Sequence, residues 1–474
     1  MVSGLSAIVI VGLTLAAFIV IGVRASRRSD DVEDFVVARN SQPASTLALS
    51  FLAAGMGAWI LFAPPEVGAG IGPIAVAGYA LGAAAPIAAF GLLGPRIRAV
   101  VPQGHSLSEF VRVRFGRSFQ VYVTAISLLY MLFFVMAELT AVGGVVAILT
   151  GGDGRLAIVA VAVATLAYTV YGGLRASLTT DRYQAWLIMA LLAAAAVAVV
   201  ALADGSGAAA GSAAPARPAA LPVAFTLIIA VTAANLFHQG YWQRVWAAAD
   251  DRQLRRGAAL GALATVPVVA VLGGLGVIAA SRGLELGTPP VPFFALLAGL
   301  PAIVAIGVLV LGIALVASSV DTLETGLASL VTVERPAISL GAARLLTVAM
   351  MVPAVIVALQ GFSVLQLFLI ADLLCAATAV PALVCLWGRA TTAGALSGAV
   401  AGLAGALLGG VISEGGLAGA RLVTMPDAVP TLPPFLGALL ASAVVTIVVS
   451  LAGRRATDLT AAGRRVPVLR GTAP

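Results

Sequence analysis

The sequence predicts an all-α polytopic membrane protein with about thirteen transmembrane helices. Three observations support this prediction: long apolar stretches fill most of the 474 residues, the mean hydropathy is +1.08, and only 10% of the residues are charged. A stretch of about 20 apolar residues is long enough to cross a bilayer as a helix. So few charges leave too little polar surface to solvate a globule, whereas lipid tolerates apolar residues on every side of a helix.

Short connections separate the predicted spans. Because no connection greatly exceeds about twenty residues, we expect a single transmembrane domain over 1–474 and no separate soluble domain. We expect residues 454–474 to form a polar cytoplasmic tail. The spans are 5–23, 45–70, 73–94, 119–149, 156–173, 181–203, 222–243, 257–280, 301–331, 341–360, 363–387, 392–412 and 433–453.

The arginines give the orientation of the chain. Basic residues in short loops are retained on the cytoplasmic side of a membrane, and this chain has no lysine, so arginine carries the whole signal. With the N-terminus outside, 23 arginines lie inside and four lie outside, namely Arg155, Arg217, Arg282 and Arg421. We therefore expect a multi-pass plasma-membrane protein, in a bacterial inner membrane, with its N-terminus outside and its C-terminus in the cytoplasm.

Composition also excludes several classes of protein. The basic residues flank membrane spans and form no patch with interleaved aromatics, so a nucleic-acid partner is excluded. The apolar run at 5–23 has no basic residue before it and is followed by arginines, which indicates a retained helix and no cleaved signal peptide. His105 and His238 are the only histidines, and no nucleophile lies near a base in sequence, so we expect no enzyme and no cofactor.

Two spans carry helix-breaking or polar residues at membrane depth. The span at 45–70 contains AAGMGAWILFAPPEVGAG, and the span at 222–243 runs into NLFHQGYWQRVW. Discontinuous helices at matching positions of two halves point to a transport site. The alternative is that the glycines only allow close helix packing and the prolines only kink the helices.

The span at 301–331 contains an adjacent pair of hydroxyl side chains. Ser318 and Ser319 could simply bond to carbonyls one turn back in their own helix. However, Asp321 and Glu324 lie close by, and intramembrane carboxylates usually mark a polar path or a cytoplasmic end. A hard cation such as Na⁺ favours oxygen ligands, which two hydroxyls and the freed carbonyls of a broken helix would supply.

Five segments of the chain are distinctive, namely DFVVARN at 34–40, SLSEFVRVRFG at 106–116, YTVYGGLRASLTTDRYQ at 168–184, YWQRVWAAADDRQLRRG at 241–257 and ASSVDTLETGLASL at 317–330. Through these segments the sequence resembles the sodium:solute symporter family over nearly its whole length. The resemblance implies an inverted-repeat core of the leucine-transporter type, with repeats over 45–203 and 222–387 and peripheral helices over 5–23 and 392–453.

The resemblance also implies an ion site and a gate. The sodium site would use the Ser318 and Ser319 hydroxyls together with backbone carbonyls, and no other metal is implied. Those carbonyls belong to Ala53, Met56 and Leu315. Asp181 would belong to the inner gate, although the charge of an ordinary helix N-terminus would explain it equally well.

Several residues are candidates for contact with the solute. A proline substrate is disfavoured, because two aromatic positions of proline-transporting relatives are Ala137 and Leu236 here. Glu138 and Asp372 could titrate with protons, hold a cationic or amide-bearing solute, or only hold helices together. We expect Trp242 and Trp246 to anchor a helix at the membrane interface. The candidate solute-binding residues are Gly57, Trp59, Glu66, Glu138, His238, Gln239 and Asp372.

The sequence therefore favours a secondary active transporter that couples inward Na⁺ movement to uptake of a small polar organic solute. A second interpretation replaces Na⁺ with protons carried by Glu138 or Asp372. A third is a sensor that acts with a separate signalling protein. The expected partners are the solute, Na⁺ and the bilayer, with no obligatory protein partner.

The orientation can be tested by labelling. A cysteine introduced at Gly211 should react with an impermeant thiol reagent in intact cells, whereas one introduced at Gly463 should not. The reason is that the arginine distribution places the first outside and the second inside. Equal labelling at both positions contradicts the orientation.

Overall fold

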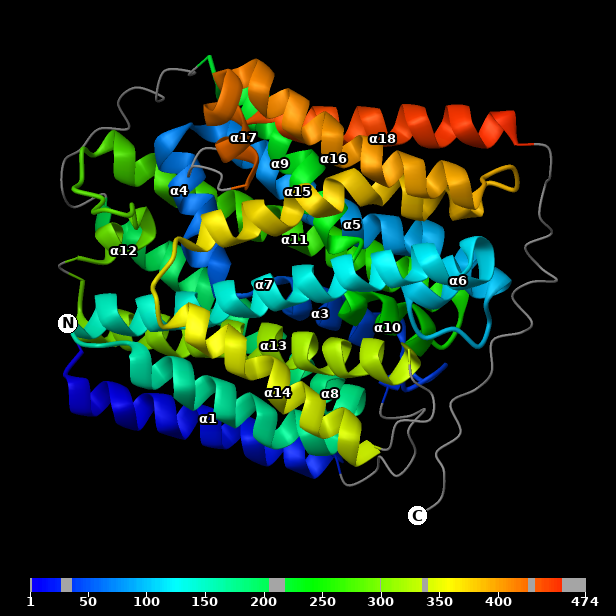
Figure 1. Cartoon of the computed structure of the whole chain (residues 1–474). Coiled ribbons are helices and arrows are strands. Elements are labelled where there is room, and N and C mark those ends of the chain that lie inside the picture. The colour runs from blue at the N-terminus through cyan, green and yellow to red at the C-terminus, as the bar shows by residue number, and fades with distance from the viewer. Residues whose placement is uncertain are drawn as a thin grey trace.

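The structure is a computed structural model that describes residues 2–26, 36–203, 218–298, 300–334, 340–424 and 431–453. These residues form helices and no strand. Most of the long helices run in one general direction across the molecule (Figure 1). Helices α6 (Leu107–Phe115) and α10 (Gln239–Ala247) lie at one end of this bundle, and α4 (Ala63–Gly70) and α12 (Pro292–Leu297) lie at the other. The predicted tail at 454–474 lies outside the described residues.

The remaining helices divide between the two halves of the chain. Those of the first half are α1 (Gly4–Ser26), α3 (Ala44–Gly55), the 3₁₀ helix η1 (Ala58–Leu61), α5 (Pro73–Val100), α7 (Arg117–Thr150) and α8 (Arg155–Ala203). Those of the second half are α9 (Ala220–Asn235), α11 (Asp251–Ser281), α13 (Ala302–Glu334), α14 (Leu340–Ala358), α15 (Val364–Leu383), η3 (Val384–Leu386), α16 (Thr392–Glu414), α17 (Gly416–Thr424) and α18 (Leu432–Ala452).

The predicted spans all fall on helices. Among the described residues, eight helices are long and apolar enough to cross a membrane, and two bent pairs bring this number to ten. The predicted spans 156–173 and 181–203 lie in α8, in which two helices meet at a kink with non-helical backbone at Gly173, where φ is 52°. Glycine adopts this positive φ at little cost, whereas other residues would be strained. The total of thirteen crossings stays a prediction.

Both predicted discontinuous helices are broken in the structure. The first pair comprises α3 and the segment Ala58–Gly70, and the second comprises α9 and α10. Each pair bends by 61° at its break. At the first break Met56 ends α3, and Gly57 has an extended backbone with φ −86° and ψ −179°. The interpretation that these residues only pack or kink the helices is therefore wrong.

The segment 106–116 contains the short helix α6. In α6, the Ser106 side chain accepts a hydrogen bond from the Glu109 backbone N–H, and the Glu109 side chain accepts one from the Ser106 backbone. This is a capping box, in which two otherwise unpaired N–H groups at the start of a helix are satisfied.

The expectation for Trp242 and Trp246 is wrong. Each indole is only 1% exposed, so neither lies at an interface. The Trp242 Nε1–H donates to the Leu236 carbonyl at 2.7 Å, and that of Trp246 donates to the Val101 carbonyl at 3.1 Å. The reason is that α10 packs inside the bundle against α5, α13 and α3, so its aromatic side chains meet protein on every side.

Small residues allow α4 to pack tightly against α11. A Cβ atom added at Gly276 would lie 2.0 Å from the Pro65 carbonyl oxygen, and one added at Gly68 would lie 2.0 Å from the Gly273 carbonyl oxygen. Such close backbone contact is characteristic of membrane helices, where van der Waals packing replaces the hydrophobic driving force. The outer half of the first broken helix is thereby held against α11.

This packing predicts the effect of a pair of substitutions. Gly276→Val should lower the free energy of unfolding by more than the 1–3 kcal/mol typical of an overpacked core, at about 4 kcal/mol, because the new side chain meets main-chain atoms that cannot rotate away. Gly274→Val in the same helix is the control, since nothing lies within 4 Å of its added Cβ. Thermal unfolding in detergent measures both, and equal melting temperatures contradict the packing.

Candidate functional site

A narrow cavity of about 30 Å³ lies beside the first helix break. Its wall is mostly aromatic and aliphatic and comes from α3, η1, α5, α7, α9, α10 and α15. The lining residues are Gly55, Met56, Trp59, Tyr79, Ala83, Ile87, Tyr130, Phe134, Leu227, Val231, Asn235, Tyr241, Leu365, Phe368, Leu369 and Asp372. Among the described residues this wall contains one carboxylate, that of Asp372.

Aromatic rings pack against one another around this cavity. Trp59 stacks on Tyr79 with ring centroids 5.5 Å apart, and its other neighbour is the edge of Phe368 at 6.1 Å. Phe134 meets Phe368 edge-to-face at 4.9 Å. The Trp59 Nε1–H donates to the Gly55 carbonyl at 3.2 Å, across the helix break. The rings are therefore held by one another and by the backbone of the break.

Asp372 places a carboxylate in the wall of the cavity. Its side chain is only 5% exposed, yet no hydrogen bond or ion pair to it is found within the described part of the chain. An ionised carboxylate held away from water is costly unless it meets a cation or several donors. The predicted residues Trp59 and Asp372 therefore come together in one cavity.

Glu138 lies next to this cavity, at the break itself. Its Oε2 atom accepts a hydrogen bond from the Ala58 backbone N–H at 2.7 Å. Its Oε1 atom is buried and has no hydrogen-bond partner within the described residues. Gly57 contacts the same carboxylate, since a Cβ added there would lie 1.9 Å from Oε1. Glu138 and Gly57 thus form one contact between α7 and the broken helix.

The other predicted solute-binding residues lie elsewhere. Glu66 lines a separate, larger pocket of about 600 Å³ at the α4 end of the bundle. Gln239 points away from the cavity, donating from Nε2 to the His105 carbonyl at 2.7 Å and contacting the Ser329 hydroxyl at 3.1 Å. His238 stacks on Tyr241 with centroids 4.6 Å apart, and its ring nitrogens are buried and unpaired within the described chain. It therefore lies behind the cavity wall.

The five predicted sodium ligands lie at the end of α3 and in the middle of α13. These two helices pack against each other, and all five residues are at most 1% exposed. The Ser319 hydroxyl is buried and has no partner among the described residues, whereas the Ser318 hydroxyl donates to Asp181 Oδ1 at 2.9 Å. The alternative, in which both hydroxyls bond to carbonyls of their own helix, is not what the structure contains.

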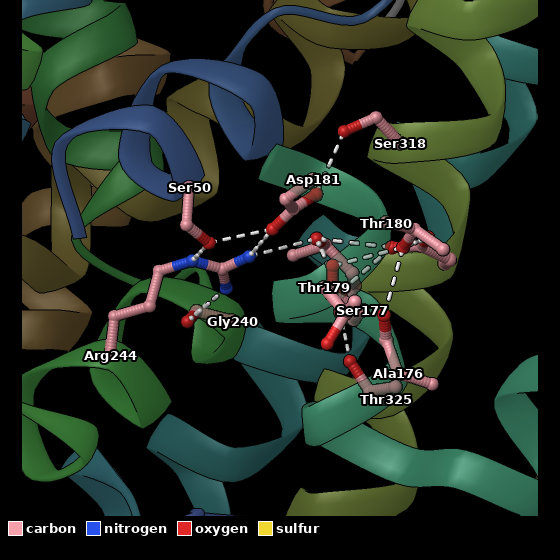
Figure 2. Close-up of polar contacts among 12 residues, drawn as sticks. Ser50, Ala176, Ser177, Thr179, Thr180, Asp181, Gly240, Arg244, Ser318 and Thr325 are labelled. Carbon is pink, nitrogen blue, oxygen red and sulfur yellow. Dashed lines mark hydrogen bonds and ion pairs between the residues drawn. The ribbon is translucent and has the colours of Figure 1, made fainter. Parts of the chain in front are cut away.

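Asp181 lies at the centre of a buried polar network (Figure 2). Arg244 Nη2 contacts Asp181 Oδ2 at 2.6 Å, and both side chains are completely buried. The guanidinium also donates to the Ser50 hydroxyl and to the Gly240 carbonyl, each at 2.7 Å. Since these residues belong to α3, α8 and α10, and Ser318 to α13, the pair joins both broken helices to α13.

A layer of hydroxyl groups surrounds two further acids of α13. Asp321 accepts hydrogen bonds from Tyr168 and Ser177, both at 2.8 Å. Glu324 accepts from Thr165 at 2.8 Å and Thr169 at 2.5 Å. The sequence analysis identified the two acids but missed Arg244 and these hydroxyls. A lone arginine within the aromatic segment YWQRVW was the available signal for Arg244.

Comparisons with known proteins give the family and the fold of the chain. The profile of the Sodium:solute symporter family matches residues 35–272. The chain belongs to the sodium:solute symporter family. The Spermidine transporter DUR31 of Candida albicans is 30% identical over 376 residues, which cover 78% of this chain and 72% of that protein. As a member of this family the chain is a multi-pass membrane protein and a secondary transporter, and not an enzyme.

Solved structures of symporters show the same fold. A Na⁺-coupled sialic acid symporter in a substrate-bound outward-open state matches with a TM-score of 0.71 and 15% identity, covering 95% of this chain and 98% of that one. Mhp1, a nucleobase-cation-symport-1 family transporter in a closed conformation with bromovinylhydantoin bound, matches with a TM-score of 0.58 and 14% identity over 90% of this chain and 97% of that one. The predicted leucine-transporter-like fold is therefore confirmed, while the repeat boundaries stay a prediction.

Substitutions in the buried Asp181–Arg244 pair should lower the free energy of unfolding of this symporter, whereas a substitution in a surface ion pair should change it little. Asp181→Asn or Arg244→Gln should each lower the free energy of unfolding by about 3–5 kcal/mol, because the remaining charge stays buried without its partner. The double variant should recover part of this loss. Arg155→Gln is the control, because Arg155 and Asp153 are 71% and 68% exposed and their pair contributes about 0–1 kcal/mol. Thermal unfolding measures the four variants, and single variants as stable as the control contradict the role of the pair.

Proposed function

We propose that this symporter takes up a small organic cation with several amino groups, of the polyamine class, and couples its uptake to Na⁺. The observation that carries the proposal is the Asp372 carboxylate, which lies without a cation partner in an aromatic cavity at the first helix break. A protonated amine would supply the missing positive charge. The spermidine transport named for the Candida albicans relative supports the same class of solute.

The wall of the cavity suits an alkylammonium chain. Aliphatic amines resemble the lysine side chain, whose pKa is about 10.4, so they are cationic at neutral pH. Trp59, Tyr79 and Phe134 offer aromatic faces, and a desolvated cation gains about 2 kcal/mol over such a face. In the present conformation the cavity of about 30 Å³ holds only water-sized molecules, so solute binding requires the helices to move apart.

The coupling ion would lie between α3 and α13. The Ser319 hydroxyl is buried and unpaired in the described chain, which costs about 1–3 kcal/mol unless a ligand satisfies it. Na⁺ would take this oxygen together with the Ser318 hydroxyl and the carbonyls of Ala53, Met56 and Leu315. Because Ser318 also donates to Asp181, binding of Na⁺ at the ion site would directly affect the contacts of Asp181 with Ser318 and Arg244.

Orientation and location complete the proposal. In it the protein lies in the plasma membrane with its N-terminus outside, so α6 and α10 are at the cytoplasmic end. The relative named above is fungal and therefore gives no support to a bacterial inner membrane. Proton coupling through Glu138 or Asp372 remains the competing mechanism, and the following experiment separates the two.

The proposal predicts that two substitutions change different properties of spermidine uptake into liposomes. Ser319→Ala should raise the Na⁺ concentration for half-maximal uptake about tenfold, a change of about 1.4 kcal/mol, with little effect on the KM for spermidine at saturating Na⁺. Asp372→Asn should raise that KM at least about tenfold and leave the Na⁺ response nearly unchanged.

Ser442→Ala is the control, because among the described residues the Ser442 hydroxyl bonds only to the Leu439 carbonyl within peripheral α18. If a proton gradient alone drives uptake and Na⁺ has no effect, sodium coupling is wrong. If Asp372→Asn transports spermidine like the parent, the proposed anchor is wrong.

A further inference from the structure

We propose that the Glu138 carboxylate at the first helix break excludes solute carboxylates and binds one terminal ammonium group of a linear polyamine whose other terminal ammonium group binds Asp372. The inference rests on the proposed function and deepens it, since it names the length and charge pattern of the solute. It assigns to Glu138 a specificity role that differs from that of Asp372.

The first step is the position of the carboxylate. Glu138 Oε2 accepts the backbone N–H of Ala58, the first residue of the segment Ala58–Gly70 that forms the outer half of the broken helix. The first N–H groups of a helix have no partner within the helix and carry partial positive charge. In transporters with broken helices, such N–H groups commonly point at an anionic group of the substrate. Here a side chain of the protein already occupies that place.

The second step is that the chain is shaped around this carboxylate. A Cβ added at Gly57 would lie 1.9 Å from Oε1, 2.2 Å from Cδ and 2.3 Å from Oε2 of Glu138. Only glycine therefore allows the carboxylate to reach the break. A carboxylate on the solute would compete for the same N–H groups and would be repelled by a like charge in a site of low dielectric.

The third step is the free oxygen. Glu138 is completely buried, and its Oε1 has no hydrogen-bond partner among the described residues. The residues on both sides of the break, Met56 and Trp59, line the cavity, as does Phe134 one helical turn before Glu138. A solute in the opened cavity would therefore bring a donor to Oε1, and an ammonium group would also balance its charge.

The fourth step gives the spacing of the two acids. Helices α7 and α15 run in opposite directions, because Arg114 just before α7 donates to the carbonyls of Trp387 and Gly388 just after α15. The Phe134–Phe368 contact sets their register, with Glu138 four residues beyond one ring and Asp372 four residues beyond the other. At 1.5 Å per residue, the acids are displaced by about 12 Å along the bundle.

This displacement matches a particular solute length. An extended chain spans about 1.2 Å per bond, so nitrogens nine bonds apart, as in spermidine, are separated by about 11 Å. Butane-1,4-diamine, with five bonds between its nitrogens, spans about 6 Å on the same scale. The longer amine reaches both carboxylates, whereas the shorter one reaches Asp372 alone.

The test is binding to the purified full-length protein with Na⁺ present, measured by ligand-induced thermal shift and by competition with spermidine uptake. Glu138→Gln keeps an acceptor oxygen for the Ala58 N–H, so the fold should persist. It should weaken spermidine binding at least tenfold and change butane-1,4-diamine binding less than twofold. Ser127→Ala on the same helix is the control and should bind both amines like the parent.

A second variant tests the exclusion of carboxylates. The parent should not bind 8-aminooctanoate, in which nine bonds separate the nitrogen from a carboxylate oxygen, whereas Glu138→Ala, which vacates the break, should bind it. If Glu138→Gln weakens both amines equally or neither of them, or if Glu138→Ala does not gain 8-aminooctanoate binding, the role of Glu138 is wrong. If the parent binds neither amine, the proposed function itself is wrong, and this inference falls with it.

Discussion

The two breaks in the membrane-spanning helices impose the constraint on which the rest of the structure depends. A continuous helix satisfies its own main-chain groups, but a break releases N–H and C=O groups in a region without water to receive them. Side chains from a neighbouring helix or from across the break bind some of these groups. Glu138 of α7 accepts the Ala58 N–H, and the indole of Trp59 donates to the Gly55 carbonyl. At the second break, the Trp242 indole donates to the Leu236 carbonyl in the same way. Of these side chains, Trp59 also lines the cavity.

The same constraint explains why an arginine is buried at the centre of the molecule. A buried ion pair gains little stability over an apolar core, but it specifies one arrangement of its neighbours, because every donor must find its partner. The Arg244 guanidinium reaches Asp181, Ser50, Gly240 and Thr322 at once. These residues belong to α8, α3, α10 and α13, so the four helices cannot separate at this end without leaving charges unpaired.

The sequence predicted the elements and their breaks because those features are local. Hydropathy locates a span, a Gly-Met-Gly run interrupts it, and the capping box of α6 lies within four residues. Depth in the membrane can also be read from the sequence, so Glu66, Glu138 and Asp372 were recognised as polar residues within spans.

The direction in which each side chain points cannot be read in this way. Gln239 and Glu66 point away from the cavity, and the tryptophans of α10 point into the bundle, because these directions depend on partners distant in sequence. The contact of Glu138 with Ala58 joins residues 80 positions apart, so no local sequence pattern predicts it.

The distribution of unpaired groups offers a physical basis for coupling. In the described chain the Asp372 carboxylate, Glu138 Oε1 and the Ser319 hydroxyl all lack a partner. Closing the protein around such groups is costly while they are unpaired, and becomes favourable when cations satisfy them. Under the proposed function, an organic cation satisfies the two acids and Na⁺ satisfies the serine. Because Ser318 connects the ion site to Asp181 and Arg244, and the first broken helix connects that site to the cavity, each cation stabilises the arrangement that the other requires. Movement of the fully loaded protein is then favoured over movement with one site empty, which is the condition for symport.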